Sequence, residues 1–161
     1  CTFGMPASPF LCKGVCGDEF SKDVLELNRL VLGENKKNTA SYFIAKCLKL
    51  LPKPKIVVSY ADTEMGHLGY VYQACNFIYT GRSANRTDVD TGEKHARHIN
   101  GFDPNKRKKR SSKHRYIYFC GSKTQKKLYL KSLNYAPQAY PKGDNQYYQT
   151  HEISAKQGIL L

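Results

Sequence analysis

Tryptophan is absent from this 161-residue chain, and acidic side chains are scarce: 13 Asp and Glu stand against 26 Lys and Arg, for a formal net charge of +13. No apolar run approaches the roughly 20 residues that a membrane-spanning helix needs. The chain is nevertheless long enough to bury one core without a disulfide or a metal. The charge imbalance favours a polyanionic partner, the alternative being a solvated basic tail.

The six cysteines do not have the pattern of a secreted disulfide framework. Cys47 and Cys75 fall at apolar positions of predicted helices, where a free thiol packs as a small hydrophobe. Cys12 and Cys16 have a spacing that could serve a metal, but no second Cys/His pair of zinc-finger spacing accompanies them. We therefore expect reduced thiols and, with them, a cytoplasmic protein.

Hydrophobic periodicity predicts an alternation of strands and helices in the first half of the chain. Apolar residues recur every three or four positions in two segments, which predicts helices at 40–51 and 68–75. They alternate or run together elsewhere, which predicts strands at 24–32, 55–62 and 77–83. This order is typical of a single α/β domain with a mixed sheet flanked by helices. Residues 1–20, rich in Gly and Pro, are expected to form a loop or hairpin.

Four polar side chains fall where such a fold builds sites. Asp62 follows a buried strand, and Ser41 lies in the first turn of the longer helix. Ligands of open α/β sheets bind at the carboxyl ends of strands and at helix N-termini. Arg29 lies inside an apolar strand and needs a partner, either an internal acid such as Glu26 or a ligand anion. Tyr72 lies on the apolar stripe of the shorter helix. Each has an ordinary explanation as a cap, a core residue or a surface residue, but together they indicate a site at one edge of the sheet.

A basic run precedes a further predicted strand at 116–119. It lies in a predicted loop at about 103–115, and it suits a loop that lies on a phosphate backbone. The alternative is a solvated basic loop, and the sequence leaves both open. The side chains expected to contact nucleic acid are Lys106, Arg107, Lys108, Lys109, Arg110, Lys113 and Arg115.

Longer blocks of the sequence resemble a known family. The segments "LELNRLVL", "KNTASYFIAKCLKLLPK", "IVVSYAD" and "GHLGYVYQACNFIYTG", with "KHRYIYF" and a later "YPKG", resemble the Mom-type DNA-modification proteins of bacteriophages and prophages. The similarity runs from "CTFGMPASP" at the start to about Gly143. It therefore covers most of the chain rather than a short motif.

The resemblance implies one domain, residues 1–161, with a fold similar to that of the GNAT acyltransferases. It implies a transferase that converts adenine in double-stranded DNA to N6-carbamoylmethyladenine, which protects phage or prophage DNA from restriction in a bacterial host. The family's catalytic positions correspond to Arg29, Ser41, Asp62 and Tyr72 of this sequence.

The resemblance leaves the cofactor open, with acetyl-CoA and iron or another divalent metal as the candidates. GNAT enzymes hold the cofactor's pyrophosphate at a Gly-rich turn, whereas the turn here, "GENKKNTAS", contains one Gly. Asp62 is the metal ligand expected in this sequence, and its His and Tyr companions are expected upstream of Cys1, in an N-terminal portion missing from the chain. The residues expected to bind the acetyl-CoA anion are Lys36, Lys37, Asn38 and Thr39.

The chemistry of adenine gives the acid at the strand end a role. The N6 lone pair is delocalised into the ring and the amine is paired in duplex DNA, so an enzyme must flip the base and supply a base or a metal. We expect Asp62 to accept the proton and Tyr60 and Tyr72 to stack on the adenine. Two alternatives remain: a GNAT-type N-acyltransferase acting on a protein or RNA amine, and a non-enzymatic basic nucleic-acid-binding module.

Overall fold

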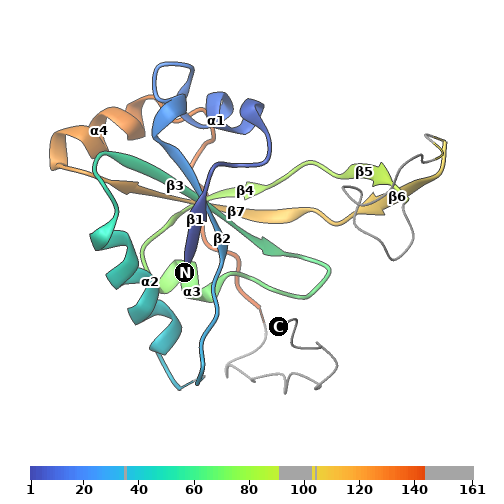
Figure 1. The fold of residues 1–161 in the computed structure, drawn as a ribbon, viewed down its shortest axis with the longest axis horizontal. Coiled ribbons are helices and arrows are strands. Elements are labelled where there is room, and N and C mark those ends of the chain that lie inside the picture. The colour runs from blue at the N-terminus through green and yellow to red at the C-terminus, as the bar shows by residue number, and fades with distance from the viewer. Residues whose placement is uncertain (35, 91–102, 104, 144–161) are drawn as a thin grey trace.

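Five strands pair into one mixed sheet in the part of the chain that the computed structural model describes, residues 1–34, 36–90, 103 and 105–143 (Figure 1). These strands are β1 (Thr2–Gly4), β2 (Val24–Arg29), β3 (Lys55–Asp62), β4 (Ile78–Arg82) and β7 (Lys113–Cys120). The helices are α1 (Pro9–Cys16), α2 (Thr39–Leu50), α3 (Tyr70–Ala74) and α4 (Lys123–Lys131), with a 3₁₀ turn at Ser21–Asp23. Two further strands, β5 (Arg86–Val89) and β6 (Arg107–Arg110), form a sheet of their own.

The order of the main sheet is β1-β2-β3-β7-β4, in which β2 and β3 run parallel and the other neighbours are antiparallel. Helices α1 and α4 cover one face, and α2 and α3 cover the other (Figure 1). The α/β class with a mixed, helix-flanked sheet is therefore confirmed. Within the described ranges, no helix has both the length and the apolar character that crossing a bilayer requires.

Two hydrophobic layers stabilise the sheet, one on each face. Successive residues of a strand point to opposite faces, so β3 contributes to both layers. Ile56 and Val58 pack against α1 and α4, whereas Val57 packs against Ile44 and Leu48 of α2. All three β3 valine and isoleucine side chains are fully buried. This alternation fixes which side chains of β3 and of its neighbours β2 and β7 can meet at the end of the sheet.

The sheet opens between its two parallel strands. The β2–β3 ladder pairs Val24, Leu25 and Glu26 with residues 56–58, and it ends at the pair Glu26–Val58. Beyond that point β3 stays paired with β7 and β2 stays paired with β1, so the two central strands separate. One side chain bridges the start of the gap, because the Ser59 hydroxyl donates to the Leu27 carbonyl at 3.4 Å.

Residues 1–20 are not the loop or hairpin that their Gly and Pro content predicts. They contain the edge strand β1 and the helix α1. Pro9 begins α1, where its missing N–H is no loss. Cys12, Val15 and Cys16 then bury one face at a spacing of three and four residues. The sequence does contain the helical spacing of these apolar residues, but the segment is short and lies beside several glycines, so it did not predict a helix.

The longer predicted helix is confirmed as α2, whose N-cap residue is Asn38. Its buried residues are Ile44 and Leu48. The prediction that Cys47 is buried is wrong, since this residue is half-buried, and Phe43 is 36% exposed. The apolar stripe is therefore narrower than the sequence indicates.

Two further boundaries differ from the prediction. The strand expected at 24–32 ends at Arg29, and Val31 beyond it is 68% exposed. The loop expected at 103–115 contains β6 and the beginning of β7. Strand β6 reads Arg-Lys-Lys-Arg and pairs with β5, about twenty residues earlier, so no apolar alternation marks it.

We predict that thiol alkylation of the native protein distinguishes Cys47 from the buried cysteines. Cys75 and Cys120 are buried, and burial raises the pKa of both thiols, which lowers the reactive thiolate fraction. An iodoacetamide time course read by peptide mass spectrometry should modify Cys47 first and reach the other two only after denaturation. Equal rates at Cys47 and Cys75 would contradict the packing of α2 against α3.

Candidate active site

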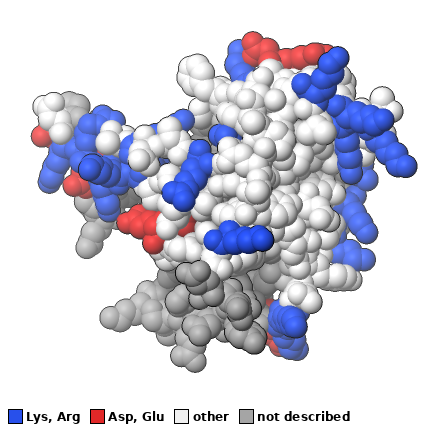
Figure 2. Space-filling view, turned by 180° about the vertical axis from the view of Figure 1, so that it is seen from behind, with Lys and Arg blue, Asp and Glu red and all other residues white. Residues whose placement is uncertain are grey.

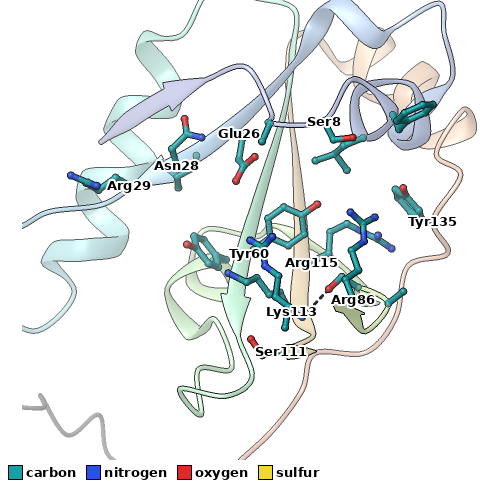
Figure 3. A pocket seen from close by; sticks show the side chains of 18 of the residues that line it. Ser8, Glu26, Asn28, Arg29, Tyr60, Arg86, Ser111, Lys113, Arg115 and Tyr135 are labelled. Carbon is teal, nitrogen blue, oxygen red and sulfur yellow. Dashed lines mark hydrogen bonds between the residues drawn. The ribbon is translucent and has the colours of Figure 1, made fainter. Parts of the chain in front are cut away.

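A cavity of about 720 Å³ lies where β2 and β3 separate (Figure 3). We call it the central pocket. Strands β2, β3 and β7 supply much of its charged and aromatic lining, α1 contributes Phe10 and Leu11, and α3 contributes Tyr72. Its volume falls within the roughly 300–1,000 Å³ of small-molecule sites. Its charged side chains are one acid, Glu26, and five bases: Arg29, Arg86, Arg110, Lys113 and Arg115.

Side chains from both faces of the sheet reach the central pocket. Tyr60 belongs to the layer under α1, and Glu26 lies on the same face of β2 as the core residue Val24. Leu27 and Tyr72 belong to the layer under α2 and α3. The two sets meet because the ladder has ended, so no strand lies between them. An intact parallel sheet would keep them apart.

Glu26 is a half-buried carboxyl group without a hydrogen bond or an ion pair to any residue that the structure describes. Burial raises the pKa of Glu26, and the charges of Lys113 and Arg110 oppose that rise. In Figure 3 the carboxyl group points toward the Tyr60 ring and the interior of the pocket. A carboxyl group with a raised pKa and no partner is suited to exchange a proton with a ligand.

Arg115 forms a rigid cationic wall of the central pocket. Its guanidinium carbon lies 3.4 Å from the centre of the Tyr135 ring. Its Nε donates to the Thr80 hydroxyl at 2.9 Å, and a terminal nitrogen donates to the Thr80 carbonyl at 3.1 Å. Beside it, burial raises the pKa of Tyr60 to about 12, although Arg115 opposes the rise. Tyr60 therefore stays a neutral phenol at physiological pH.

Of the four side chains predicted to be catalytic, Arg29 and Tyr72 line the central pocket. Arg29 is exposed at the end of β2 and has no ion pair with Glu26, which lies on the opposite face of the strand. Tyr72 is held by the Tyr116 and Phe77 rings, whose centroids lie 5.3 and 5.5 Å from its own. Burial raises the pKa of Tyr72.

Asp62 lies behind the wall of the central pocket rather than in it. Its Oδ1 accepts hydrogen bonds from the Ser111 hydroxyl at 2.6 Å and from the Glu64 amide at 3.0 Å. Its Oδ2 pairs with Lys113 Nζ at 3.2 Å. The hydrogen bond from Ser111 is the largest influence, and together these contacts lower the pKa of Asp62. Asp62 thus fixes two residues that line the pocket.

Ser41 and the predicted anion-binding residues lie away from the lining of the central pocket. The Ser41 hydroxyl donates to the Asn38 carbonyl at 3.1 Å, in the manner of a helix-start residue. Lys36 pairs with Glu34 at 2.6 Å, and Lys37 is exposed. The amide of Thr39 donates to the Lys36 carbonyl. These residues form the N-terminus of α2, where the helix dipole favours an anion.

The described residues do not fit a metal ion. They contain no group of three or more His, Cys, Asp and Glu side chains that could hold one. Both carboxylate oxygens of Asp62 already have partners. Cys12 and Cys16 are core residues, and burial raises the pKa of Cys16 to about 11. The histidines nearest to a zinc pattern, His95 and His98, lie outside the described residues.

The basic side chains predicted to bind nucleic acid fall into two places. Lys106 precedes β6, and Arg107 to Arg110 form it; all five are exposed, and Arg110 also lines the central pocket. Lys113 and Arg115 lie on β7 and line the central pocket. The sequence missed that Glu26, Arg86 and Tyr135 also line it. An acid in an apolar strand was the available signal for Glu26, whereas nothing local marks Arg86 or Tyr135.

A comparison with protein-family models matches residues 1–142 to the Mom protein family. A search of the curated proteins finds no match.

We predict that Asp62→Asn lowers the free energy of unfolding by about 1 kcal/mol at about pH 7, because it removes a charge-assisted contact that solvent partly screens. A group with a lowered pKa stabilises the fold above its unfolded pKa, and this contribution is lost as the pH falls through the folded value. Urea titrations should therefore show the deficit shrinking toward about pH 3.

Asp18→Asn is the matched control, because Asp18 pairs with Lys13 on the surface and its side chain is 74% exposed. Its effect should stay below about 0.5 kcal/mol at every pH. A deficit for Asp62→Asn that does not depend on pH would mean that its charge does not stabilise the wall of the pocket.

Proposed function

The chain belongs to the Mom protein family, and on that basis we propose that it is a transferase that modifies the N6 amine of adenine in double-stranded DNA, with the central pocket as its active site. The product that the family resemblance implies is N6-carbamoylmethyladenine, and the biological role is protection of phage or prophage DNA from restriction. Family membership by itself is consistent with a DNA-modifying enzyme and implies DNA as the substrate.

The observation that carries this proposal is the carboxyl group of Glu26. It lies in a pocket with five cationic side chains and the rings of Tyr60, Tyr72 and Tyr135. Cations at the mouth suit a phosphate backbone, and aromatic rings suit an extruded base. Glu26 is suited neither to binding phosphates nor to stacking on a base, but its raised pKa suits it to proton transfer. One pocket thus supplies groups for binding, for stacking and for chemistry.

In the proposed step the N6 nitrogen of the flipped adenine attacks an electrophilic carbon of the donor. The new N–C bond forms as the donor's leaving group departs with its electron pair, and Glu26 accepts the proton that N6 loses. Removing this proton during attack compensates for the low nucleophilicity of the amine. The neutral phenol of Tyr60, beside Glu26, gives the adenine an uncharged surface on which to stack.

The residues predicted from the sequence take supporting roles in this proposal. Arg29, exposed and without an ion pair in the described chain, binds an anionic part of the donor or of the DNA. Tyr72 forms the wall that enters from the α3 side. Asp62 is a positioning residue, because it holds Ser111 and Lys113. The proposal gives Ser41 a place in the first turn of α2 rather than at the reacting atoms.

For an acyl-CoA donor we propose the N-terminus of α2 as the phosphate-binding segment. Transfer of its acyl group to N6 would form an amide, so the carbamoylmethyl product requires a donor whose electrophilic carbon is a CH2 group that carries a carboxamide. The segment consists of Lys36, Lys37, Asn38 and Thr39 at the start of a twelve-residue helix. Its support is the helix dipole together with the exposed charge of Lys37. No step is assigned to iron or another metal, since the described residues do not fit one.

We predict that Glu26→Gln abolishes modification while the protein remains folded. The substitution keeps the shape of the side chain and removes its basicity, so modified adenine should fall by roughly a hundredfold or more. The measurement is nucleoside mass spectrometry of DNA from cells that express the chain, with thermal melting of each purified variant.

Glu19→Gln is the matched control, because Glu19 is an exposed acid in the same part of the chain and does not line the pocket. It should leave the yield of modified adenine unchanged. A folded Glu26→Gln variant that modifies adenine normally would refute the role of Glu26. Absence of modified nucleosides with the unaltered chain would favour the protein or RNA acyltransferase, or the non-enzymatic binding module.

A further inference from the structure

Strands β5 and β6 form a two-stranded ribbon that extends from the body of the protein (Figure 1). Seven of its eight residues are exposed, and Val89 is half-buried. The ribbon carries five Lys and Arg side chains and one acid, Asp88, and these cations gather at the left of Figure 2. A two-stranded ribbon with no core on either face is marginally stable alone, so its surface is suited to a partner.

The register sorts the basic side chains of the ribbon onto two faces. Cross-strand partners share a face, so Arg86 and Arg110 lie on the same side, and Lys108 joins them opposite Asp88. Arg86 and Arg110 also line the central pocket. This face of the ribbon is therefore continuous with the pocket. Lys109, next to Lys108 in the chain, lies on the opposite face.

The root of the ribbon is fastened to the sheet. Ser83 and Lys113 exchange two hydrogen bonds, of 2.8 and 2.9 Å, where β4 and β7 continue into the ribbon. The Thr63 hydroxyl donates to the Ser112 carbonyl at 2.7 Å. Asp62 holds Ser111 at 2.6 Å on the same side. Three consecutive residues of the root, 111–113, are thus bound by the end of β3 and by Ser83, which fixes the direction of the ribbon relative to the pocket.

We propose that the ribbon inserts into the major groove of duplex DNA and presents the adjacent base to the central pocket. The inference rests on the proposed function, and it adds the groove from which the DNA is approached and the segment of the protein that enters it. The major groove, about 12 Å wide, admits a two-stranded β-ribbon, whereas the minor groove, about 6 Å wide, takes one only when the DNA is deformed to widen it.

The chemistry of adenine leads to the same groove. The N6 amine is one of the groups that an A·T pair presents in the major groove. A ribbon seated there, with its root at the wall of the pocket, lies on the side of the duplex where the reacting atom is exposed. Arg86, Lys108 and Arg110 on the pocket face then meet base edges or phosphates, while Lys109 faces away from the floor of the groove.

The test measures binding by fluorescence anisotropy with a labelled duplex of about two helical turns, in three forms. The first is unmodified, the second has cytosines bearing glucosylated hydroxymethyl groups that fill the major groove, and the third is saturated with netropsin in the minor groove. Filling the major groove should weaken binding at least about tenfold, and netropsin should change it less than about twofold. Weakening by netropsin alone, or by neither treatment, would overturn the proposal.

A matched pair of variants ties the effect to the ribbon. Lys108→Gln with Arg110→Gln, both on the pocket face of the ribbon, should weaken binding to the unmodified duplex about tenfold or more and reduce the log–log salt slope by about two. In this variant, filling the major groove should weaken binding by less than about threefold relative to the unmodified duplex. The control is Lys123→Gln with Lys127→Gln on α4, at the other end of the molecule (Figure 1), which removes the same charge and should bind within about twofold of the unaltered chain. The inference would be wrong if filling the major groove weakened binding of the ribbon variant as strongly as it weakens binding of the unaltered chain.

The outcomes separate this inference from the proposed function. If modified adenine is found but filling the major groove does not weaken DNA binding, the proposed transferase activity is supported and the insertion of the ribbon into the major groove is refuted. If filling the major groove weakens binding only when the ribbon is unaltered, but no modified adenine is found, the ribbon proposal is supported and the proposed transferase activity is refuted.

Discussion

The end of the β2–β3 ladder at Glu26 and Val58 is the constraint on which the remaining structure depends. Parallel strands that stayed paired would keep Glu26 and Arg29 on opposite sides of a continuous sheet. Instead β2 remains hydrogen-bonded to β1 and β3 remains hydrogen-bonded to β7, so β2 and β3 can separate from each other. Eight pairs with β7 hold β3 straight to Asp62, so the gap stays open at no cost to the core. The pocket follows from this choice of partners rather than from any single side chain.

Asp62 couples the open sheet to the ribbon. It is the last residue of β3, it pairs with Lys113 of β7, and its two carboxylate oxygens fasten the chain where β6 becomes β7. An acid at a strand end was a reasonable candidate for catalysis, because such positions collect ligands. Three protein donors lower its pKa, so it is a weak base at neutral pH. In the proposed function, Asp62 therefore positions Ser111 and Lys113, and proton transfer is assigned to Glu26, a carboxyl group with no such donors.

What the sequence predicted well is local in origin, and what it missed depends on distant partners. Helix α2 and strand β3 bury residues at their own characteristic spacing, so each could be recognised within a dozen residues. Strand β6 has no apolar residue and exists by pairing with β5, which local pattern does not encode. Helix α4 did carry a usable signal, the capping box of Ser122 and Gln125. In the site, Arg29 and Tyr72, two of the residues predicted from the sequence, line the pocket, whereas Arg86 and Tyr135 reach it through the ribbon and the C-terminal chain.

The excess of positive charge bears directly on the acid in the pocket. Burial raises the pKa of Glu26, while Lys113 and Arg110 hold it down. Phosphates that approach these two cations offset their field at Glu26, because opposite charges in contact largely cancel at a distance. Desolvation, which is already the largest influence on Glu26, is then less opposed, and in the proposed complex the DNA that covers the pocket increases it further. Glu26 consequently becomes a stronger base when its cationic neighbours are engaged than when the pocket faces water. In the proposed reaction, Lys113 and Arg110 thus keep Glu26 a weaker base until the phosphates of the DNA engage them.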